Sequence, residues 1–208
     1  MKILVVCGAG KMYGREVVTL SLMKELRDRG HQLACLTSTW SDGKFQKQVE
    51  SLSIPCTSAA LGFISKQLDW SAFRMTLVQL IKLPVLWVRY RRTLKSFRPD
   101  VVLHSDFHHV FLLWPLLGAA RNVFHVHDYF APTRFYSRMF RLLCRRLDTV
   151  VAVSHFIGES LTRVGIPEDR IKCVLNGISL DKADGRAQDV AVSRQVRSEM
   201  CKPRVGIV

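Results

Sequence analysis

The sequence predicts an α/β fold in which helices flank a Rossmann-like, doubly wound parallel sheet. Short apolar runs at 3–7, 101–103 and 149–153 alternate with longer amphipathic segments. Such alternation is typical of parallel strands, which need crossover helices. The runs are almost continuously apolar, as expected for strands that are buried on both faces. With 208 residues, 48% of them hydrophobic, the chain suits one large domain with a buried core.

Each element follows from its own local pattern. The expected strands are 3–7, 33–37, a short step near 54–55, 99–103, 122–126, 149–153 and 171–175. The expected helices are 14–30, 67–97, 107–120 and 133–147, with a further helix capped by Ser154. Gly30 is the expected stop of the first helix. Pro84 is expected to kink or split the long one.

The last part of the chain differs in character from the rest. Residues 178–203 are polar and show no apolar face. We therefore expect one domain over 1–178 and a linker or disordered segment over 179–203. Residues 204–208 resemble the first strand of a second domain, which this chain would lack.

The charge balance favours phosphate-bearing partners. Lys and Arg number 31 against 17 Asp and Glu, a net charge of +14. Six cysteines form no C-x-x-C pair, which is typical of reduced thiols in a cytosolic protein. The apolar run after Lys2 breaks at Gly8, so no secretory signal is expected. The run 75–88 is too short and too interrupted to span a membrane.

Two basic segments predict a surface that binds anionic membrane lipids. Arg134, Arg138, Arg141 and Arg145 recur at helical spacing, and Arg89, Arg91 and Arg92 lie in a stretch, 70–99, that has no acidic residue. Ordinary exposed helices mix both signs of charge, so an unmixed run favours an anionic partner. A plain solvated face remains the alternative. Nucleic acid is not expected, because no stacking, helix-turn-helix or finger pattern is present.

A glycine-rich turn follows the first strand. Gly8, Gly10 and Gly14 lead into a helix, whose N-terminus favours phosphate. Their spacing is not that of the common NAD fingerprint, and no acidic residue ends the second strand. The hypothesis that the chain is an NADP-dependent reductase is supported by this turn alone. The other reading is that these glycines only permit a tight turn.

His125-Val126-His127-Asp128 ends a predicted strand, at the sheet edge where ligands bind in this fold class. We expect His125 to point into the core and His127, with Asp128, to lie at the edge. The H-x-H-D pattern also occurs in hydrolytic metal sites. No further ligand follows at useful spacing, so no metal is predicted.

Several segments resemble one family of sugar transferases, often called group 1 or family 4, with the GT-B fold. They are Leu147–Ser154, Leu161, Gly165–Pro167, Arg170–Ile171 and Cys173–Ile178, with Arg29–His31 and Arg98–Val102. Gly14-Arg15-Glu16 corresponds to the end of the family's G-G-x-E turn, with Tyr13 in place of the first glycine. His127 and Asp128 match its histidine followed by Asp or Asn. Arg170 replaces the usual lysine.

The resemblance implies a retaining, metal-independent transferase that uses a nucleotide-sugar donor and needs no other cofactor. Gly14, with Tyr13, would face the donor diphosphate, and His127, assisted by Asp128, would contact the sugar and the acceptor. Ser154, Asn176 and Gly177 would face the cleft between two halves. The alternative is that Ser154 is only a helix cap and that Asn176-Gly177 is only a turn.

The same resemblance implies the partners. The acceptor would be lipid-linked or another glycan, met at the cytoplasmic face of the membrane by a peripheral protein. The donor-binding half would be a missing C-terminal domain or a separate chain, so we expect this chain alone to bind donor weakly and turn over little. The alternative function is a non-catalytic acceptor-binding or membrane-docking subunit that pairs with a separate donor-binding chain.

Overall fold

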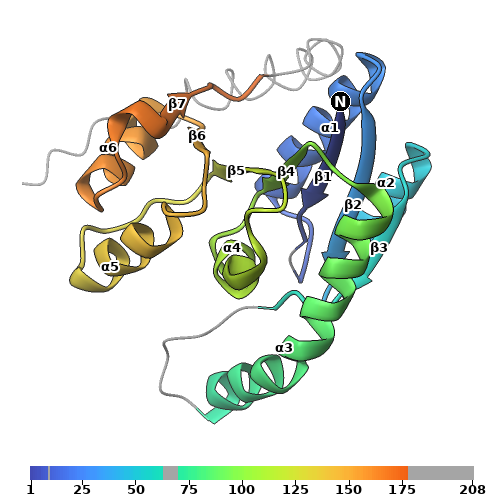
Figure 1. Ribbon diagram of the computed structural model, residues 1–208, viewed down its shortest axis with the longest axis horizontal. Helices are drawn as coiled ribbons and strands as arrows, with labels where there is room; N and C mark the ends of the chain where they lie inside the picture. Colours follow the sequence, from blue (N-terminus) through green and yellow to red (C-terminus); the bar gives the residue numbers. More distant parts are fainter. Residues whose placement is uncertain (9, 63–69, 178–208) are drawn as a thin grey trace, which may run out of the picture. The chain divides into compact units, whose positions relative to one another are not determined.

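The computed structural model describes residues 1–8, 10–62 and 70–177, and it confirms the predicted fold class. Seven strands form one sheet in the order β3-β2-β1-β4-β5-β6-β7, and all neighbouring pairs are parallel (Figure 1). Residues 1–175 make up one compact unit. The linker expected over 179–203 and the strand expected over 204–208 lie outside the described residues.

The elements have the following bounds. The strands are β1 (Lys2–Val6), β2 (Gln32–Ser38), β3 (Cys56–Ala59), β4 (Val101–His104), β5 (Arg121–Val126), β6 (Thr149–Ala152) and β7 (Ile171–Cys173). The α-helices are α1 (Gly14–Asp28), α2 (Lys44–Ser51), α3 (Trp70–Phe97), α4 (Phe107–Leu113), α5 (Arg134–Leu143) and α6 (His155–Arg163). Two short 3₁₀ turns are η1 (Trp114–Leu116) and η2 (Glu168–Arg170).

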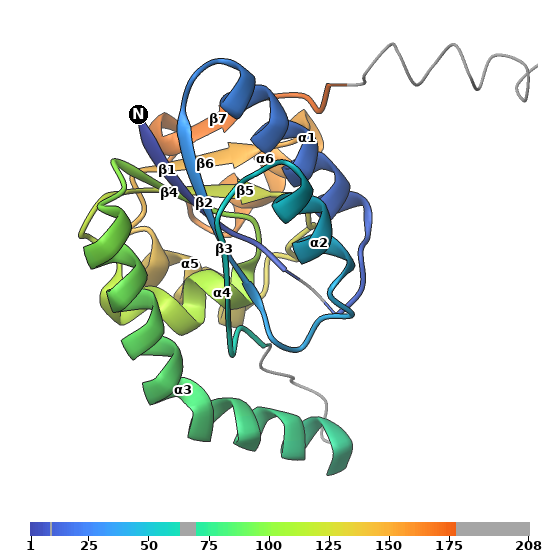
Figure 2. The same ribbon diagram turned by 90° about the vertical axis from the view of Figure 1, so that its right-hand side faces the viewer.

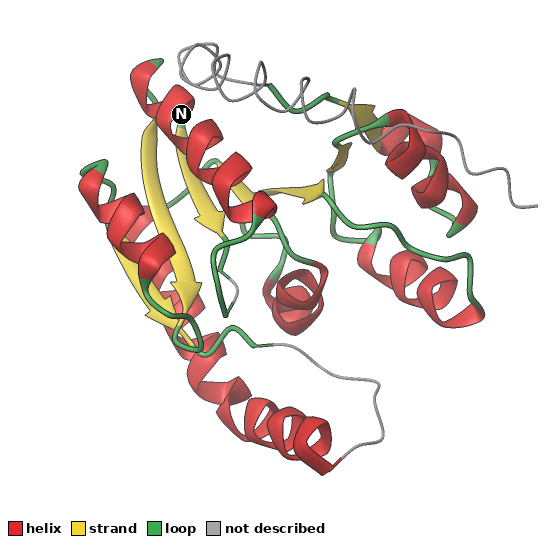
Figure 3. Cartoon of the chain, turned by 180° about the vertical axis from the view of Figure 1, so that it is seen from behind, coloured by secondary structure: helices red, strands yellow, loops and turns green. Residues whose placement is uncertain are grey.

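Helices cover both faces of the sheet, which explains the unbroken apolar run of β1. Ile3 and Val5 pack with residues of α1 and α2, whereas Leu4 and Val6 pack with residues of α3, α4 and α5. Figure 1 shows α3 in front of the strands, and the opposite view in Figure 3 brings α1 and α2 to the front. Each strand near the centre of the sheet is therefore apolar on both sides.

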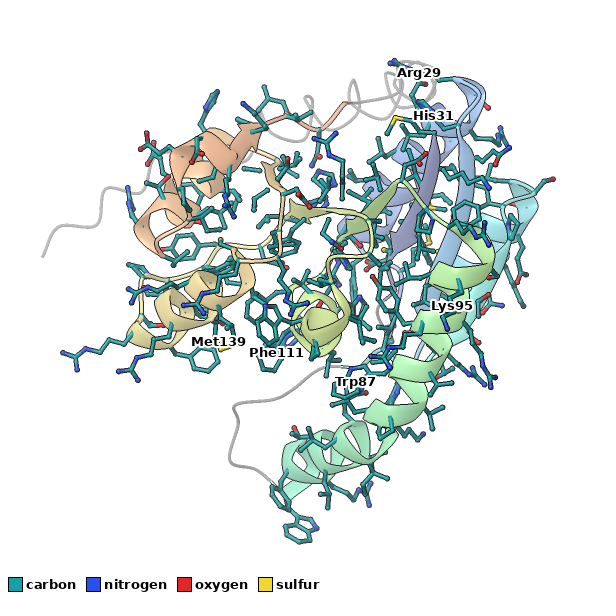
Figure 4. All side chains as sticks on the ribbon, in the orientation of Figure 1. Arg29, His31, Trp87, Lys95, Phe111 and Met139 are labelled. Atoms are coloured by element: carbon teal, nitrogen blue, oxygen red, sulfur yellow. The ribbon has the colours of Figure 1, made fainter. Side chains whose placement is uncertain are left out.

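Helices α3, α4 and α5 form one layer, which two indole groups tie together. Trp87 on α3 donates its Nε1 hydrogen to the carbonyl of Leu112 at 2.9 Å, and Trp114 on η1 donates to Leu142 of α5 at 3.2 Å. Trp87 lies between α3 and α4 in Figure 4. A buried indole needs such an acceptor, so these bonds fix the spacing of the three helices.

Helix α1 ends at the predicted glycine. Gly30 has a φ of 82°, a conformation that suits glycine. The N–H of Gly30 donates to Arg27, and the N–H of His31 donates to Leu26. These two bonds satisfy carbonyls that the end of the helix leaves without partners.

Helix α3 stays one helix through Pro84, although the residue lacks an N–H for the carbonyl four residues before it. Figure 2 shows the helix bending about halfway along its length, which agrees with the predicted kink rather than with a split. The first residues of the expected helix, 67–69, lie outside the described residues.

Two helices end earlier than their patterns predict. Helix α4 stops at Leu113, because Pro115 cannot donate the next helical hydrogen bond and the chain turns through η1. Helix α5 stops at Leu143, and the guanidinium of Arg170 donates to the carbonyls of Cys144 and Leu147 just beyond it. A side chain distant in sequence thus caps α5, which local periodicity does not reveal.

The sequence pattern missed α2 and misplaced the third strand. Phe45 and Val49, four residues apart, bury the inner face of α2, but the helix is only eight residues long. Strand β3 begins at Cys56, just after the step expected at 54–55. The other bounds differ from the expected ones by a few residues.

Candidate functional site at the carboxyl edge

The strand order places a site where β1 meets β4. From β1 the chain winds outward to β2 and β3, and from β4 it winds outward in the opposite direction to β5, β6 and β7. Ligands bind in such folds outside the carboxyl ends of the strands, at the point where the winding reverses. The residues there are Gly8 after β1, Asp106 after β4 and His127 after β5.

Arg15 joins three acidic side chains at this edge. Its Nη1 lies 2.5 Å from Oδ2 of Asp106 and 3.5 Å from Oδ2 of Asp128, while its Nε lies 3.1 Å from Oε1 of Glu16. The side chains of Arg15, Glu16 and Asp106 are only 17%, 0% and 13% exposed, whereas that of Asp128 is 62% exposed. One guanidinium therefore connects the start of α1 with the loops that follow β4 and β5.

The acid of the turn also shapes the start of α1. Glu16 is fully buried, and its Oε2 accepts the N–H of Tyr13 at 3.0 Å. This is the reciprocal half of a capping box, which satisfies an N–H that the first helical turn leaves free. Glu16 thus has a structural role, because it holds the backbone at Tyr13. Tyr13 and the following Gly14 are the two residues predicted to face the donor.

Asp106 starts the next helix. Its Oδ1 accepts the N–H of His108 at 2.7 Å and that of His109 at 3.4 Å, so it is the N-cap of α4. Burial raises the pKa of Asp106, but the charges of His109, Arg15 and His108 together bring it below its ordinary value. Asp106 is therefore ionised at neutral pH, as its ion pair with Arg15 requires.

His125 in β5 and His127 just after it lie with their rings against each other. His125 is 7% exposed, and its ring centroid lies 4.3 Å from that of His127. Burial, followed by the charge of His127, lowers the pKa of His125 to about 4. Burial, followed by the charge of Arg15, lowers the pKa of His127 to about 4. Both imidazoles are therefore neutral near pH 7, and His127, the outer one, can donate or accept a hydrogen bond.

The ring nitrogen Nε2 of His127 has no hydrogen-bond partner within the described ranges, and the same holds for Nδ1 of His125 and of His109. Buried polar nitrogens are normally paired. These imidazoles therefore keep unused hydrogen-bonding capacity beside the carboxyl edge of the sheet, as does Nδ1 of the structural His104.

The glycines of the turn differ in what they do. A Cβ on Gly8 would lie 2.6 Å from Oγ1 of Thr37 and 2.8 Å from the backbone nitrogen of Ser38, so the close approach of β2 requires glycine there. A Cβ on Gly14 would meet nothing within 4 Å. Gly8 is therefore needed for close packing against β2, whereas the space beside Gly14 stays open at the start of α1.

Two residues in or next to the family-like segments are structural: Asp148, in the segment Leu147–Ser154, and His104, just after Arg98–Val102. His104 is fully buried, its Nε2 lies 3.2 Å from Oδ1 of Asn122, and burial lowers its pKa to about 4. Asp148 accepts the backbone N–H of Asn122 at 2.7 Å, which ties the chain before β6 to β5. These parts of the family-like segments therefore maintain the sheet.

Ser154 caps α6, as its position after a strand predicts. Its Oγ accepts the N–H of Ile157 at 3.2 Å. Beside it, the exposed rings of Tyr129 and Phe156 stack with centroids 5.3 Å apart. A cleft-facing role for Ser154 stays a prediction. The same holds for Asn176 and Gly177, which begin a second compact unit and are its only described residues.

The outer side of the α3–α5 layer is basic and apolar. Exposed arginines are Arg134, Arg138 and Arg141 on α5, Arg145 just beyond it, and Arg89, Arg91 and Arg92 on α3. In the part of the chain that is described, none of them pairs with an acidic side chain. Exposed apolar side chains on α3 are Trp70, Phe73, Leu77, Leu80, Ile81, Val85 and Val88, each between 46% and 78% exposed. We call these two sets together the basic–apolar face.

The opposite side of α5 is only partly as predicted. Leu143 and the following Leu147 are buried, and Met139 and Leu142 are half-buried. The helical spacing predicts Phe135, Met139, Leu142, Leu143 and Leu147 on the side opposite the arginines. Phe135 is 46% exposed, so this prediction is wrong for Phe135. It lies at the first turn of the helix, where the chain enters from solvent.

Within the described residues, no three His, Cys, Asp or Glu side chains are grouped so as to hold a metal ion. Within the same residues, no helix combines the length and the apolar character needed to cross a bilayer.

Sequence reasoning singled out His127, Asp128 and Gly14, and the structure places them at one edge. It missed Arg15 and Asp106, the pair that connects them. Arg15 was the unspecified third position of a four-residue turn, and no sequence motif included Asp106. Their partnership spans 91 positions in the sequence, and a single sequence carries no signal for such a contact.

Comparisons with solved structures support the fold. HepE of Anabaena in complex with UDP-glucose shares 22% identity over 87% of this chain and 45% of that chain, with a TM-score of 0.62. The lipopolysaccharide outer core galactosyltransferase WaaB shares 16% identity over 86% of this chain and 46% of that one, with a TM-score of 0.56. UDP-GlcNAc 2-epimerase of Neisseria meningitidis shares 14% identity over 96% of this chain and 54% of that chain, with a TM-score of 0.54.

The chain spans about half the length of the solved structures it resembles. Likeness at this level of identity shows the fold alone, and the fold is shared by transferases and epimerases. None of the curated protein sequences matches this chain. The sequence model of the family described as Glycosyltransferase Family 4 matches residues 13–182. That range includes Gly14, both His125 and His127, and the signature that ends at Ile178, so the chain belongs to glycosyltransferase family 4.

Proposed function

We propose that this chain is the acceptor-side half of a retaining glycosyltransferase that moves a sugar from a nucleotide-sugar donor to a lipid-linked or glycan acceptor. The observation that carries the proposal is the connection between the start of α1 and the end of β5. Arg15 on α1 reaches Asp128, the neighbour of His127, at 3.5 Å. A phosphate site and a sugar-contacting histidine would thereby be held in one arrangement.

The start of α1 suits the donor diphosphate. The N–H groups of Gly14 and Arg15 make no hydrogen bond to any other residue that the structure describes. Such free N–H groups, together with the helix dipole, favour a phosphate. The open space beside Gly14 allows a close approach to the backbone. Because the guanidinium of Arg15 is occupied by carboxylates, the phosphate would meet backbone groups rather than this side chain.

His127 suits the reacting end of the donor. Sugar transfer develops positive charge at the anomeric carbon while the diphosphate leaves, and the neutral imidazole adds no opposing positive charge. The Nε2 atom of His127 is buried without a partner among the described residues, so a turn of the half-buried ring would be needed to offer it to a sugar or acceptor hydroxyl, while Asp128 beside it lies at the exposed edge. Positioning and fixed electrostatics of this kind account for much of the catalysis in enzymes.

The placement of the donor can be tested on the ¹⁵N-labelled 208-residue chain with a panel of nucleotide sugars. We expect weak binding that shifts the amide signals of Gly14 and Arg15 and the ring signals of His127. His31, which precedes β2 at the opposite edge of the sheet, is the internal control and should not shift. Shifts confined to that edge, or none near Gly14 at saturating nucleotide sugar, would remove the proposed donor side.

We further propose that the basic–apolar face rests on anionic lipid at the cytoplasmic side of the membrane, as a lipid-linked acceptor would require. From Trp70 to Val88 the apolar stripe of α3 runs for about 27 Å. The arginines on the same layer of helices have no acidic partner among the described residues. Each basic side chain near an anionic bilayer contributes about 1 kcal/mol, and an apolar helix side adds partial insertion.

Vesicle flotation tests the membrane proposal. The protein should bind vesicles that contain phosphatidylglycerol at low salt and dissociate at high salt. Replacing Arg138 and Arg141 with Gln removes two attractions of about 1 kcal/mol each, so binding should weaken roughly 30-fold. Lys24→Gln on α1, which covers the other face of the sheet, is the matched control. Equal binding to neutral vesicles would exclude the electrostatic part of the proposal.

A further inference from the structure

Two cysteines lie side by side in the sheet. Cys35 on β2 and Cys56 on β3 are register partners in a parallel pair, and both pack in the cluster between the sheet and the helices α1 and α2. Their side chains therefore leave the same face of neighbouring strands. Neighbouring strands are about 4.8 Å apart. Disulfides bridge Cα atoms that are about 4.4–6.8 Å apart, so this pair lies within range.

The two thiols differ in exposure and already interact. Cys35 is 1% exposed, whereas Cys56 is half-buried and reaches the surface at the start of β3. A hydrogen bond from the Cys35 thiol lowers the pKa of Cys56, and the same bond, with burial, raises the pKa of Cys35. Thiolate character and access decide which cysteine an oxidant attacks. Cys56 is therefore the thiol that reacts first with an oxidant, and Cys35 is the thiol that then forms the disulfide with it.

We propose that Cys35 and Cys56 form a reversible dithiol–disulfide site that takes hydrogen peroxide or a similar two-electron oxidant. The Cys56 thiolate attacks one peroxide oxygen, which breaks the O–O bond; the leaving oxygen takes a proton and departs as water, and Cys56 becomes a sulfenic acid. The sulfur of Cys35 then displaces the sulfenic oxygen as a second water. Two thiols and one peroxide thus give one disulfide and two waters.

The position of β3 favours a reversible bond. β3 is an edge strand of four residues with β2 as its one neighbour in the sheet, so it can tilt to bring the Cβ atoms closer. Disulfides usually need Cβ atoms about 3.5–4.5 Å apart, which is closer than neighbouring strands place them. A bond that needs such a shift is easily reduced, and labile bonds of this kind are the regulatory ones.

Neighbouring thiols do not compete for this role. Cys7, just after β1, is fully buried, and burial raises its pKa to about 12. Cys144 is buried, and burial raises its pKa as well. Cys173 on β7 is exposed and lies at the other edge of the sheet, far along the strand order from the pair. It is therefore the matched control.

The test maps disulfides in the reduced, folded protein after treatment with stoichiometric hydrogen peroxide, blocking of free thiols and digestion without reductant. We expect a peptide pair joined through Cys35 and Cys56 in the monomer, which dithiothreitol reverses. Cys173→Ser should keep this product, and Cys56→Ser should abolish it. The wild-type map alone decides the matter if Cys56→Ser fails to fold.

Three results would overturn the proposal. The first is oxidation confined to Cys173, seen as a linked dimer. The second is sulfinic acid at Cys56 without any joined peptide. The third is a Cys35–Cys56 product that forms only when the protein is unfolded in urea, because the native strand pairing would then have no part in it. The disulfide map does not depend on sugar transfer, so its result tests the cysteine pair independently of the proposed function.

Discussion

Replacing Arg15 with Met should strongly destabilise the protein. Methionine keeps much of the apolar stem but removes the charge that faces Glu16 and Asp106, whose side chains are 0% and 13% exposed. Removing one partner of a buried ion pair leaves an uncompensated charge and lowers stability by about 3–5 kcal/mol. Asp128 is 62% exposed, so its ion pair with Arg15 contributes little to the stability. We therefore expect the free energy of unfolding to fall by about 3–5 kcal/mol.

Urea unfolding followed by circular dichroism measures this loss. Arg29→Met is the matched control, because Arg29 and Glu25 form an exposed pair on the last turn of α1, with side chains 69% and 59% exposed. Its loss should stay below about 1 kcal/mol. Adding Asp106→Asn to Arg15→Met should restore part of the stability, since the two residues share one interaction. A loss for Arg15→Met as small as that of Arg29→Met would refute the buried network.

The remaining predictions concern pH and steric fit. Because the folded-state pKa of His104 is about 4, against 6.5 when unfolded, stability present above pH 6.5 is lost as the pH falls toward 4. His104 alone should account for about 2 kcal/mol between pH 7 and 5, which urea unfolding of the wild type and of His104→Gln would show as a difference in slope. Gly8→Ala should lower the unfolding free energy by about 1–3 kcal/mol, because its Cβ would strike the backbone of Ser38. Gly14→Ala should change it by less than about 0.5 kcal/mol in the same assay, since open space surrounds the site; equal losses would contradict the difference between the two glycines.

The fold was predictable because its signals are local and repeated. Apolar runs, the stop at Gly30 and the cap at Ser154 each act over a few residues, and the alternation of strands and helices leaves few topologies. The ends of α4 and α5 were less predictable. Pro115 sets one end through a missing N–H, and Arg170 sets the other from a distant part of the chain.

The only site residues that the strand pattern predicts are those that directly follow a predicted strand. His127 and Asp128 follow an apolar run, so the fold class alone assigns them to the ligand-binding edge. The interactions of Arg15 depend on which loops meet in space, and the orientation of the β5 histidines depends on what covers the sheet. Pairing across strands also brings Cys35 beside Cys56, which their spacing in the sequence conceals.

Sugar transfer in membranes from the source organism tests most directly whether His127 takes part in the transfer reaction. The gene at its own locus would carry His127→Ala in one strain and His31→Ala, at the opposite edge of the sheet, in another. Labelled sugar from a panel of nucleotide sugars would be followed into the lipid and glycan fractions. We predict that His127→Ala lowers transfer by about 10²–10⁴-fold at an unchanged protein level, while His31→Ala leaves transfer intact. Transfer by His127→Ala within about threefold of the wild type would contradict a role for this histidine in the reaction.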